Sequence, residues 1–285
     1  MPGYVSVANR NNKLIRKGVQ GSVFLAPAAT TAITQSALFD VTTGALQALP
    51  AGYFDLGYIS DVGAIFNRKV TATDIQAWGV NDPVRTDITA DSTTIDVMCH
   101  ETKLQTIALG VNVDPTTIVP NANGSIAVAN PIAPSLRYYR CLVVGADQGD
   151  GGEIILSRFF PRVAVTNYAP QSYANGKDPI EWGITFTAYV DSTLGFAQQQ
   201  LYGGPGFLYL ADAMDVAHVV TCTVALTTAL VATAGTFSLA DVGRPLTGAG
   251  ITAGTTIATF TDATHVVMSA VGTVAASGVA VTVGS

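Results

Sequence analysis

Charged side chains are scarce in this chain of 285 residues. Lys, Arg, Asp and Glu make up 12% of it, which is about half the share found in typical globular proteins. A low charge suits a chain that covers much of its surface in an assembly, so we expect an oligomer. Hydrophobic residues reach 48%, which is ample for a buried core and excludes a disordered chain.

Cysteine and histidine are also sparse. Cys99, Cys141 and Cys222 are far apart and show no C-x-x-C spacing. Their odd number and wide separation argue against a zinc site or a disulfide framework, so we expect small, reduced residues. The three histidines lie more than 40 residues apart and in no ligand motif. We therefore expect no metal ion and no cofactor.

Long apolar runs are missing too. No stretch of about 18 apolar residues is present, and the segment Met1–Val5 does not open a basic region followed by an apolar core. Neither a membrane span nor a secretory signal is indicated. We expect synthesis and assembly in a cytoplasm.

Charge divides the chain into three regions. Residues 1–20 hold four bases and no acid, residues 21–215 hold nine bases and eighteen acids, and residues 216–285 are nearly neutral. This pattern predicts a basic N-terminal arm, an acidic main domain and a small C-terminal domain. The arm could bind nucleic acid, but four charges without interleaved aromatic residues are a weak signal for that function. The bases of the arm are Arg10, Lys13, Arg16 and Lys17.

The main domain reads mostly as β-strands. Residues 94–99 and 184–190 alternate apolar with polar side chains, the period of a strand with one buried face. The segment 146–152 is rich in Gly and Asp between two apolar runs and predicts a hairpin turn. A phosphate cradle or a calcium loop is a weaker interpretation, because this short segment is acidic and lacks the remaining ligands. Residues 217–285 are rich in Thr, Val, Ala and Gly and predict a small all-β domain.

Two short helices are expected. Apolar residues fall at helical spacing within 102–109, and Gly110 follows as a stop. Asp191 and Ser192 are N-cap candidates for a second, weaker helix over residues 194–202.

Catalytic chemistry is not indicated. His100 and Glu101 could hint at acid–base catalysis, but no motif singles out a partner. A helix-start carboxylate interacting with the helix dipole explains Glu101 better. Ser157 and Ser172 lie in no G-x-S-x-G motif. We expect no enzymatic function.

Five short motifs are ordered along the main domain. They are Pro50–Tyr53, Leu56–Ser60, Thr73–Gly79, Val84–Thr86 and Asp191–Gly195. In this order the chain resembles the major tail-tube proteins of long, non-contractile phage tails, and most closely the branch from phages of high-GC Gram-positive hosts. The segment 240–256 is similar to add-on domains of phage structural proteins.

The resemblance implies a β-sandwich or flattened barrel with a flanking helix. Six subunits would form a ring whose strands join into a continuous inner β-barrel, and rings would stack into a hollow tail tube in the virion that conducts DNA without binding it specifically. Further partners would be the tape-measure protein and the tail terminator and distal tail proteins. The resemblance also implies a long loop over residues 40–82 that reaches a neighbouring subunit, with Trp78 as its apolar anchor. The basic arm would lie across the acidic domain of a neighbour.

Acidic residues are candidates for facing the lumen of such a tube. Asp82, Asp87, Asp91, Asp96 and Glu101 form an acidic run against Arg85 alone. Wall carboxylates would repel DNA phosphates at short range, and a solvated strand surface is the alternative. The predicted lumen candidates are Asp96, Thr94, Thr185 and Thr187.

Two other classes of protein fit parts of this pattern. A tube protein of a contractile tail or of a type VI secretion system shares the expected fold, but usually lacks an appended domain. An adhesin-like β surface protein shares the composition, but needs an export signal. In the preferred interpretation residues 216–285 project outward, either as simple decoration or in contact with the host surface.

Overall fold

The structure is a computed structural model that describes residues 12–40, 43–133, 135–149, 151–176, 179–210, 217–235, 237–238 and 241–284. It is mainly β, with 45% of residues in strands and 8% in helices, as the sequence predicts. The strands of the first sheet are β1 (Gln20–Pro27), β2 (Phe54–Asp55), β3 (Ile65–Ile75), β4 (Arg85–Cys99), β5 (Tyr138–Gly149), β6 (Gly152–Tyr168), β7 (Trp182–Ala188) and β8 (Gln199–Gly203). The helices are α2 (Gln35–Leu38) and α3 (Leu104–Gly110), and the 3₁₀ turns are η1 (Asn12–Leu14), η2 (Pro115–Thr117) and η3 (Pro205–Leu210).

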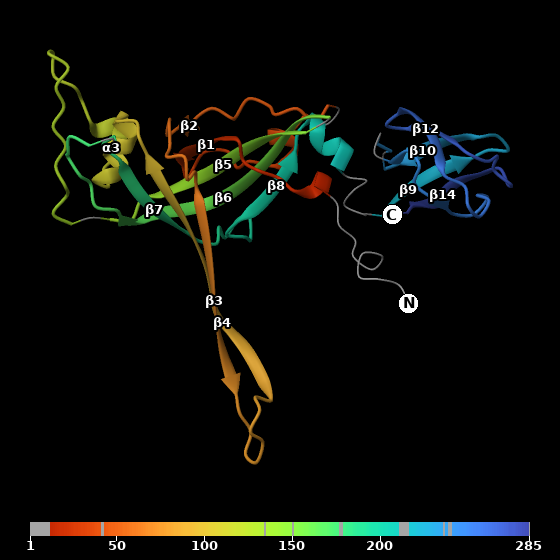
Figure 1. Ribbon diagram of the computed structural model, residues 1–285, viewed down its shortest axis with the longest axis horizontal. Helices are drawn as coiled ribbons and strands as arrows, with labels where there is room; N and C mark the ends of the chain where they lie inside the picture. The colour runs from red at the N-terminus through yellow and green to blue at the C-terminus, as the bar shows by residue number, and fades with distance from the viewer. Residues whose placement is uncertain are drawn as a thin grey trace.

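The first sheet is antiparallel and curled, with the strand order β2-β1-β5-β6-β7-β4-β3 (Figure 1). Strand β6 pairs with three other strands of this sheet. Along one edge β6 pairs with β5, and along the other it pairs first with β8 and then, through residues 163–168, with β7. The predicted antiparallel pair of β5 and β6 is confirmed, but its turn is tighter than the predicted 146–152, because β5 continues to Gly149 and pairs there with Gly152.

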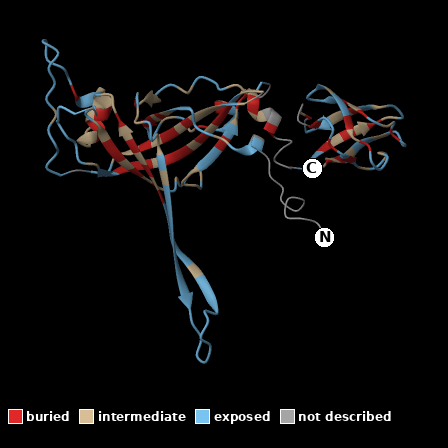
Figure 2. Cartoon of the chain, in the orientation of Figure 1, coloured by how far each residue is buried: buried red, intermediate tan, exposed pale blue. Residues whose placement is uncertain are grey.

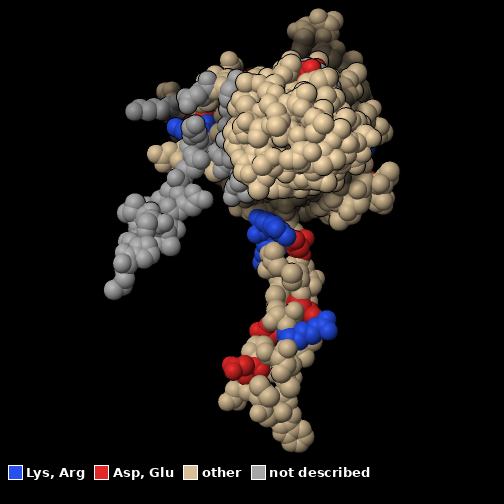
Figure 3. Space-filling view, turned by 90° about the vertical axis from the view of Figure 1, so that its right-hand side faces the viewer, with Lys and Arg blue, Asp and Glu red and all other residues tan. Residues whose placement is uncertain are grey.

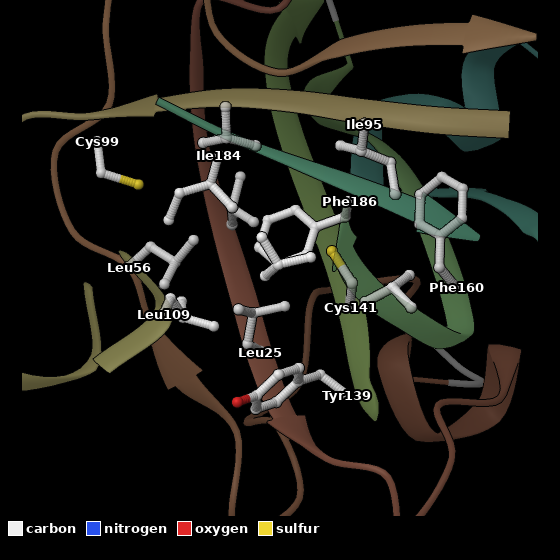
Figure 4. Packing of buried hydrophobic residues seen from close by; sticks show 14 of the residues in the cluster. Leu25, Leu56, Ile95, Cys99, Leu109, Tyr139, Cys141, Phe160, Ile184 and Phe186 are labelled. Carbon is white, nitrogen blue, oxygen red and sulfur yellow. The ribbon is translucent and has the colours of Figure 1, made fainter. Parts of the chain in front are cut away.

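The concave side of the curled sheet holds the main core (Figure 4). Strands β4 and β7 contribute the residues that their alternation predicted, such as Ile95, Val97 and Phe186, all buried. Val190 departs from that pattern and is exposed, because β7 ends at Ala188. Other members of the core come from β1, β5, β6 and α3, among them Leu25, Tyr139, Cys141, Phe160, Val163 and Leu109.

A second cluster covers the opposite face of β1, β5 and β6. Neighbouring residues of one strand therefore serve different cores: Phe160 points into the main core and Phe159 into this second cluster. Residues from α2 and β8, including Leu38 and Leu201, close the second cluster. Strands β4 and β7 have no such cover among the described residues, so one of their two faces is left to solvent.

The predicted helix over 102–109 is confirmed as α3, and it ends at Gly110, but Gly110 does not adopt the left-handed conformation of a glycine cap. The chain turns at Asn112, whose φ is 55°, and the N–H of Val113 donates to the carbonyl of Ala108 at 2.9 Å. Gly110 is instead required by packing, because a Cβ there would lie 2.9 Å from Cε3 of Trp182.

Replacing Gly110 with Ala should lower the free energy of unfolding by about 1–3 kcal/mol, since the added methyl overlaps the Trp182 ring. Denaturant unfolding measures the change. Gly18→Ala is the control, because a Cβ at Gly18 meets nothing within 4 Å. Equal stability of the two variants would contradict the packing role.

The second predicted helix, over residues 194–202, is wrong. The Asp191 carboxylate does accept from the N–H groups of Thr193 and Leu194, as an N-cap would. This turn is not continued, because Gln199–Gly203 form β8 and gain ladder hydrogen bonds from β6. The long-range pairing outweighs a weak local helical signal.

The second sheet lies wholly within the C-terminal part of the chain and has its own core. Its order is β11-β14-β9-β10-β13-β12, and all of its pairs are antiparallel. A buried ion pair between Asp241 and Arg244, 3.3 Å apart, braces the loop before β11. The strands are β9 (His218–Val224), β10 (Ala229–Ala234), β11 (Leu246–Thr247), β12 (Ile257–Asp262), β13 (His265–Met268) and β14 (Ala276–Val283).

Candidate assembly surfaces

The uncovered face of β4 and β7 is polar and internally hydrogen-bonded. Thr94 lies opposite Thr187 in the strand register, and Asp96 lies opposite Thr185. All four predicted lumen candidates therefore meet on one face, opposite the main core. We call this surface the polar face.

Hydrogen bonds among four strands fix the side chains of the polar face. The Asp96 carboxylate accepts from the Thr185 hydroxyl at 2.6 Å and from Nδ2 of Asn67 on β3 at 2.7 Å. The hydroxyls of Thr166 on β6 and Thr187 lie 2.8 Å apart. Polar side chains of β6, β7, β4 and β3 thus meet on one face of the sheet, which also carries the apolar Ile65 and Met98.

Beyond the polar face, β3 and β4 continue as a two-stranded arm that projects from the rest of the sheet (Figure 1). We call residues 68–92 the hairpin arm. Every residue in it is exposed except Asp87, which is half-buried, as the pale blue of Figure 2 shows. An isolated two-stranded hairpin is marginally stable in water, so this arm is suited to being held by a partner.

Apolar side chains stand on the hairpin arm without cover from described residues. Trp78 lies at its tip and is fully exposed, which agrees with its prediction as an inter-subunit anchor without testing it. Within the region expected as a long loop over 40–82, residues 65–75 form strand β3 and residues 76–82 belong to this tip. The other exposed apolar residues of the arm are Val70, Ile75, Val80, Val84 and Ile88.

The predicted acidic run does not form one acidic surface. Asp91 accepts from Arg68 of the opposite strand through two nitrogens, and Arg68 lowers the pKa of that carboxyl. Arg85 donates to Asp87 at 2.6 Å. Basic and acidic groups therefore alternate along the arm (Figure 3), and Asp96 is the member of the run that lies on the polar face.

Glu101 has a different role from the one predicted. Its carboxylate accepts from the backbone N–H of Tyr58 at 2.6 Å, which is the main cause of its lowered pKa, and it pairs with Lys103 at 3.1 Å. A Cβ at Gly57 would lie 2.3 Å from the Glu101 carboxyl carbon. The Leu56–Ser60 motif therefore docks on Glu101, and no acid stands in the first turn of α3.

The edge of β3 is the third assembly surface. Strand β3 pairs with β4 along its whole length, and no described strand pairs with its other edge. Residues 165–168 of β6 also pair on one side only, with β7. Unpaired N–H and C=O groups on a long strand edge are a template for pairing with another chain.

The basic arm shows a contact within its own chain. Arg16 lies 3.4 Å from Asp147 in the β5–β6 hairpin, and the backbone N–H of Lys17 donates to the same carboxylate. Arg10 and the side chain of Lys13 lie outside the described residues. These contacts lie within one chain, so the prediction that this arm lies across a neighbour stays a prediction for all four bases.

The Ser157, His100 and Cys side chains that could take part in catalysis are hydrogen-bonded or buried within the fold. The Ser157 hydroxyl donates to the carbonyl of Leu201 at 2.7 Å, and His100 contacts Glu181 at 2.9 Å. Burial raises the pKa of Cys99 and of Cys141 to about 12. Among the described residues no group of three or more His, Cys, Asp or Glu side chains is placed to hold a metal ion. No described helix is long and apolar enough to cross a membrane.

The described fold has a polar sheet face, an open strand edge and an exposed hairpin arm. These surfaces are typical of a structural β protein that binds other protein chains. The family model described as Phage tail tube protein matches residues 8–212, and the chain belongs to that family. It is therefore a structural component of the virion tail, in a family that is typically non-enzymatic and that assembles with copies of itself and other tail components. A comparison with curated proteins gave no match.

Proposed function

We propose that this chain forms hexameric rings that stack into the hollow tube of a long, non-contractile phage tail. The tube conducts DNA to the host and is built with the tape-measure, terminator and distal tail proteins. The observation that carries the proposal is the sheet β6-β7-β4-β3, which combines a polar uncovered face with open backbone edges at both ends.

The strand directions support closure of this sheet into a ring. Each of the pairs β6–β7, β7–β4 and β4–β3 is antiparallel, so β3 runs opposite to β6. Rotation about the tube axis preserves direction along the axis, so the edge of β3 would meet the β6 edge of the next subunit as an antiparallel neighbour. Strand addition of this kind gains main-chain hydrogen bonds along the joined edge.

The polar face suits the wall of a DNA channel. The Thr185 hydroxyl and Nδ2 of Asn67 already donate to Asp96, so these groups are occupied rather than offered to phosphates. Asp96 adds negative charge that repels phosphate at short range.

The assembly itself is tested by negative-stain electron microscopy of the purified chain at high concentration, combined with size-exclusion chromatography. Hollow tubes or rings of six support the proposal. A chain that stays monomeric at all concentrations, alone and with tail partners, would contradict it.

We further propose three functional regions: a basic arm (1–20), a tube domain (21–215) and a decoration domain (216–285) on the outside of the tube, where it contacts the host surface or simply covers the tube. The separate sheet and core of the C-terminal part support this division. An outside position obstructs neither DNA nor stacking.

A chain ending at Asp215 should form tubes at about the same concentration as the full chain, because the surfaces proposed for assembly all lie before that residue. Electron microscopy of both chains provides the comparison. Loss of tubes on truncation would remove the basis for an outer decoration domain.

A further inference from the structure

We propose that the hairpin arm of one ring docks on the loop between α3 and β5 of a subunit in the adjacent ring, so that rings join head to tail through these two elements. We call residues 111–137 the α3–β5 loop. The inference rests on the proposed function, because it assigns a receiving surface within the same tube.

Topology places these two elements at opposite ends of one strand. The tip of the arm precedes Arg85, the first residue of β4, whereas α3 and then the α3–β5 loop follow Cys99, its last residue. Figure 1 shows the arm and the yellow-green loop projecting in opposite directions. If β4 crosses the wall of a ring, the arm leaves one face of the ring and the loop leaves the other.

The length of the arm is sufficient to cross a ring boundary. Strand β4 pairs with β7 only from Thr94 onward, so residues 85–92 and the tip extend past the sheet. At about 3.4 Å per residue, this part of β4 reaches roughly 25 Å. That reach exceeds the roughly 10 Å that separate packed protein layers.

The α3–β5 loop is fastened at its base. Nδ2 of Asn112 donates to the carbonyl of Ser135 at 2.9 Å, and Arg137 pairs with Asp114 at 3.2 Å. These contacts hold the two ends of the loop together although more than twenty residues separate them. A long loop with a closed base is typical of a binding element rather than a passive connection.

The crown of the α3–β5 loop is uncharged and apolar. No Asp, Glu, Lys or Arg occurs in residues 115–136. Ile132 is fully exposed and Val119 is largely exposed, together with Ile126 and Leu136. Apolar side chains gathered on one exposed element mark a protein interaction site.

The tip of the arm has matching chemistry. Trp78, Val80 and Val84 are exposed within the few residues that join β3 to β4, and Asp82 is the one charged residue among positions 76–84. Burying a large aromatic side chain among aliphatic side chains contributes strongly to interfaces. The crown of the receiving loop, residues 115–136, carries aliphatic groups and no charge, so a tip with a Trp is a suitable occupant.

Cysteine cross-linking in assembled tubes tests the docking. A double variant carrying Val80→Cys and Ile132→Cys is polymerised, checked by electron microscopy, treated with a bismaleimide and separated by denaturing electrophoresis. The expected product is a covalent ladder that extends beyond the number of subunits in one ring, because head-to-tail contacts between rings do not close. The native cysteines are buried and their raised pKa values keep them slow to react.

Controls separate this inference from the proposed function. The pair Val80→Cys and Leu226→Cys places an exposed thiol in the C-terminal sheet region and should give no ladder. A ladder that stops at one ring, cross-links between Val80→Cys tips alone, or no product in well-formed tubes would overturn the docking and leave the tube intact. Absence of tubes in the unmodified chain would overturn both. If the double variant alone fails to polymerise, the exposed pair Ala77→Cys and Ala127→Cys repeats the test.

Discussion

Replacing Trp78 with Ala should raise the concentration required for tube formation by about 30-fold or more. Truncating a Trp at the centre of a protein interface costs about 2–4 kcal/mol, and about 1.4 kcal/mol corresponds to a factor of ten in affinity. Trp78 is fully exposed in the subunit, so no intramolecular packing is lost. The free energy of unfolding of the subunit should therefore stay within the usual range for a surface substitution.

Sedimentation of polymer at increasing protein concentration measures this effect, and denaturant unfolding of the subunit checks the fold. Val271→Ala is a matched control, because Val271 is an exposed apolar residue in the C-terminal part of the chain. If Trp78→Ala tubes form at the same concentration as those of the unmodified chain, the arm is not a main assembly contact.

Reversing the charge at Asp96 should turn the channel into a trap for DNA. In Asp96→Lys tubes every ring carries a circle of ammonium groups, and each phosphate contact releases counterions. We expect these tubes to retain a linear DNA duplex at 50 mM salt, and to lose affinity by about a thousand-fold or more by 200 mM salt. Tubes of the unmodified chain should retain none, because Asp96 repels phosphate.

The topology of the DNA distinguishes the channel from the outer surface. A covalently closed circle has no end to thread, so Asp96→Lys tubes should cosediment with linear but not with circular DNA. Asp96→Asn is the neutral control and keeps an oxygen that can accept from Thr185. Equal binding of both forms of DNA would place Asp96 on the outside of the tube.

The polar face could be predicted because strand periodicity is a local property. Residues two apart on a strand share a face, so the alternation around Ile95 and Phe186 located Asp96, Thr94, Thr185 and Thr187 opposite the core before the strands were paired. The pairing of β4 with β7, which brings those four side chains together, is a long-range feature. The alternation predicts which face of each strand is buried, but it does not predict which strands pair with each other.

Features that depend on cross-strand contact were missed for the same reason. Arg68 lies 23 residues before Asp91 in the sequence. The acidic run was therefore predicted with Arg85 as its one basic neighbour, and the ion pair of Asp91 with Arg68 was missed. Glu101 was assigned to the helix that follows it, whereas its partner is the N–H of Tyr58. The one available signal was Gly57, whose φ of 88° and lack of a Cβ let the carboxylate approach.

Strand β8 shows how a weak local signal is overridden. The turn at Asp191 begins as a helix N-cap does, and a sequence pattern cannot report that β6 has an edge free for Gln199–Gly203. The hairpin arm is similar: a long loop was expected over 40–82, but residues 65–75 pair with β4 and extend past the sheet without cover from described residues.

The central claim is that the polar face lines a channel. Helical reconstruction of the assembled tube by electron cryomicroscopy tests it most directly, because it locates each strand relative to the tube axis. We predict that β6, β7, β4 and β3 form the inner wall, with Asp96 and Thr185 at the channel surface and β3 paired to the next subunit. A tube with Asp96 on its outer surface, or with the channel lined by β1, β5 and β8, would contradict it.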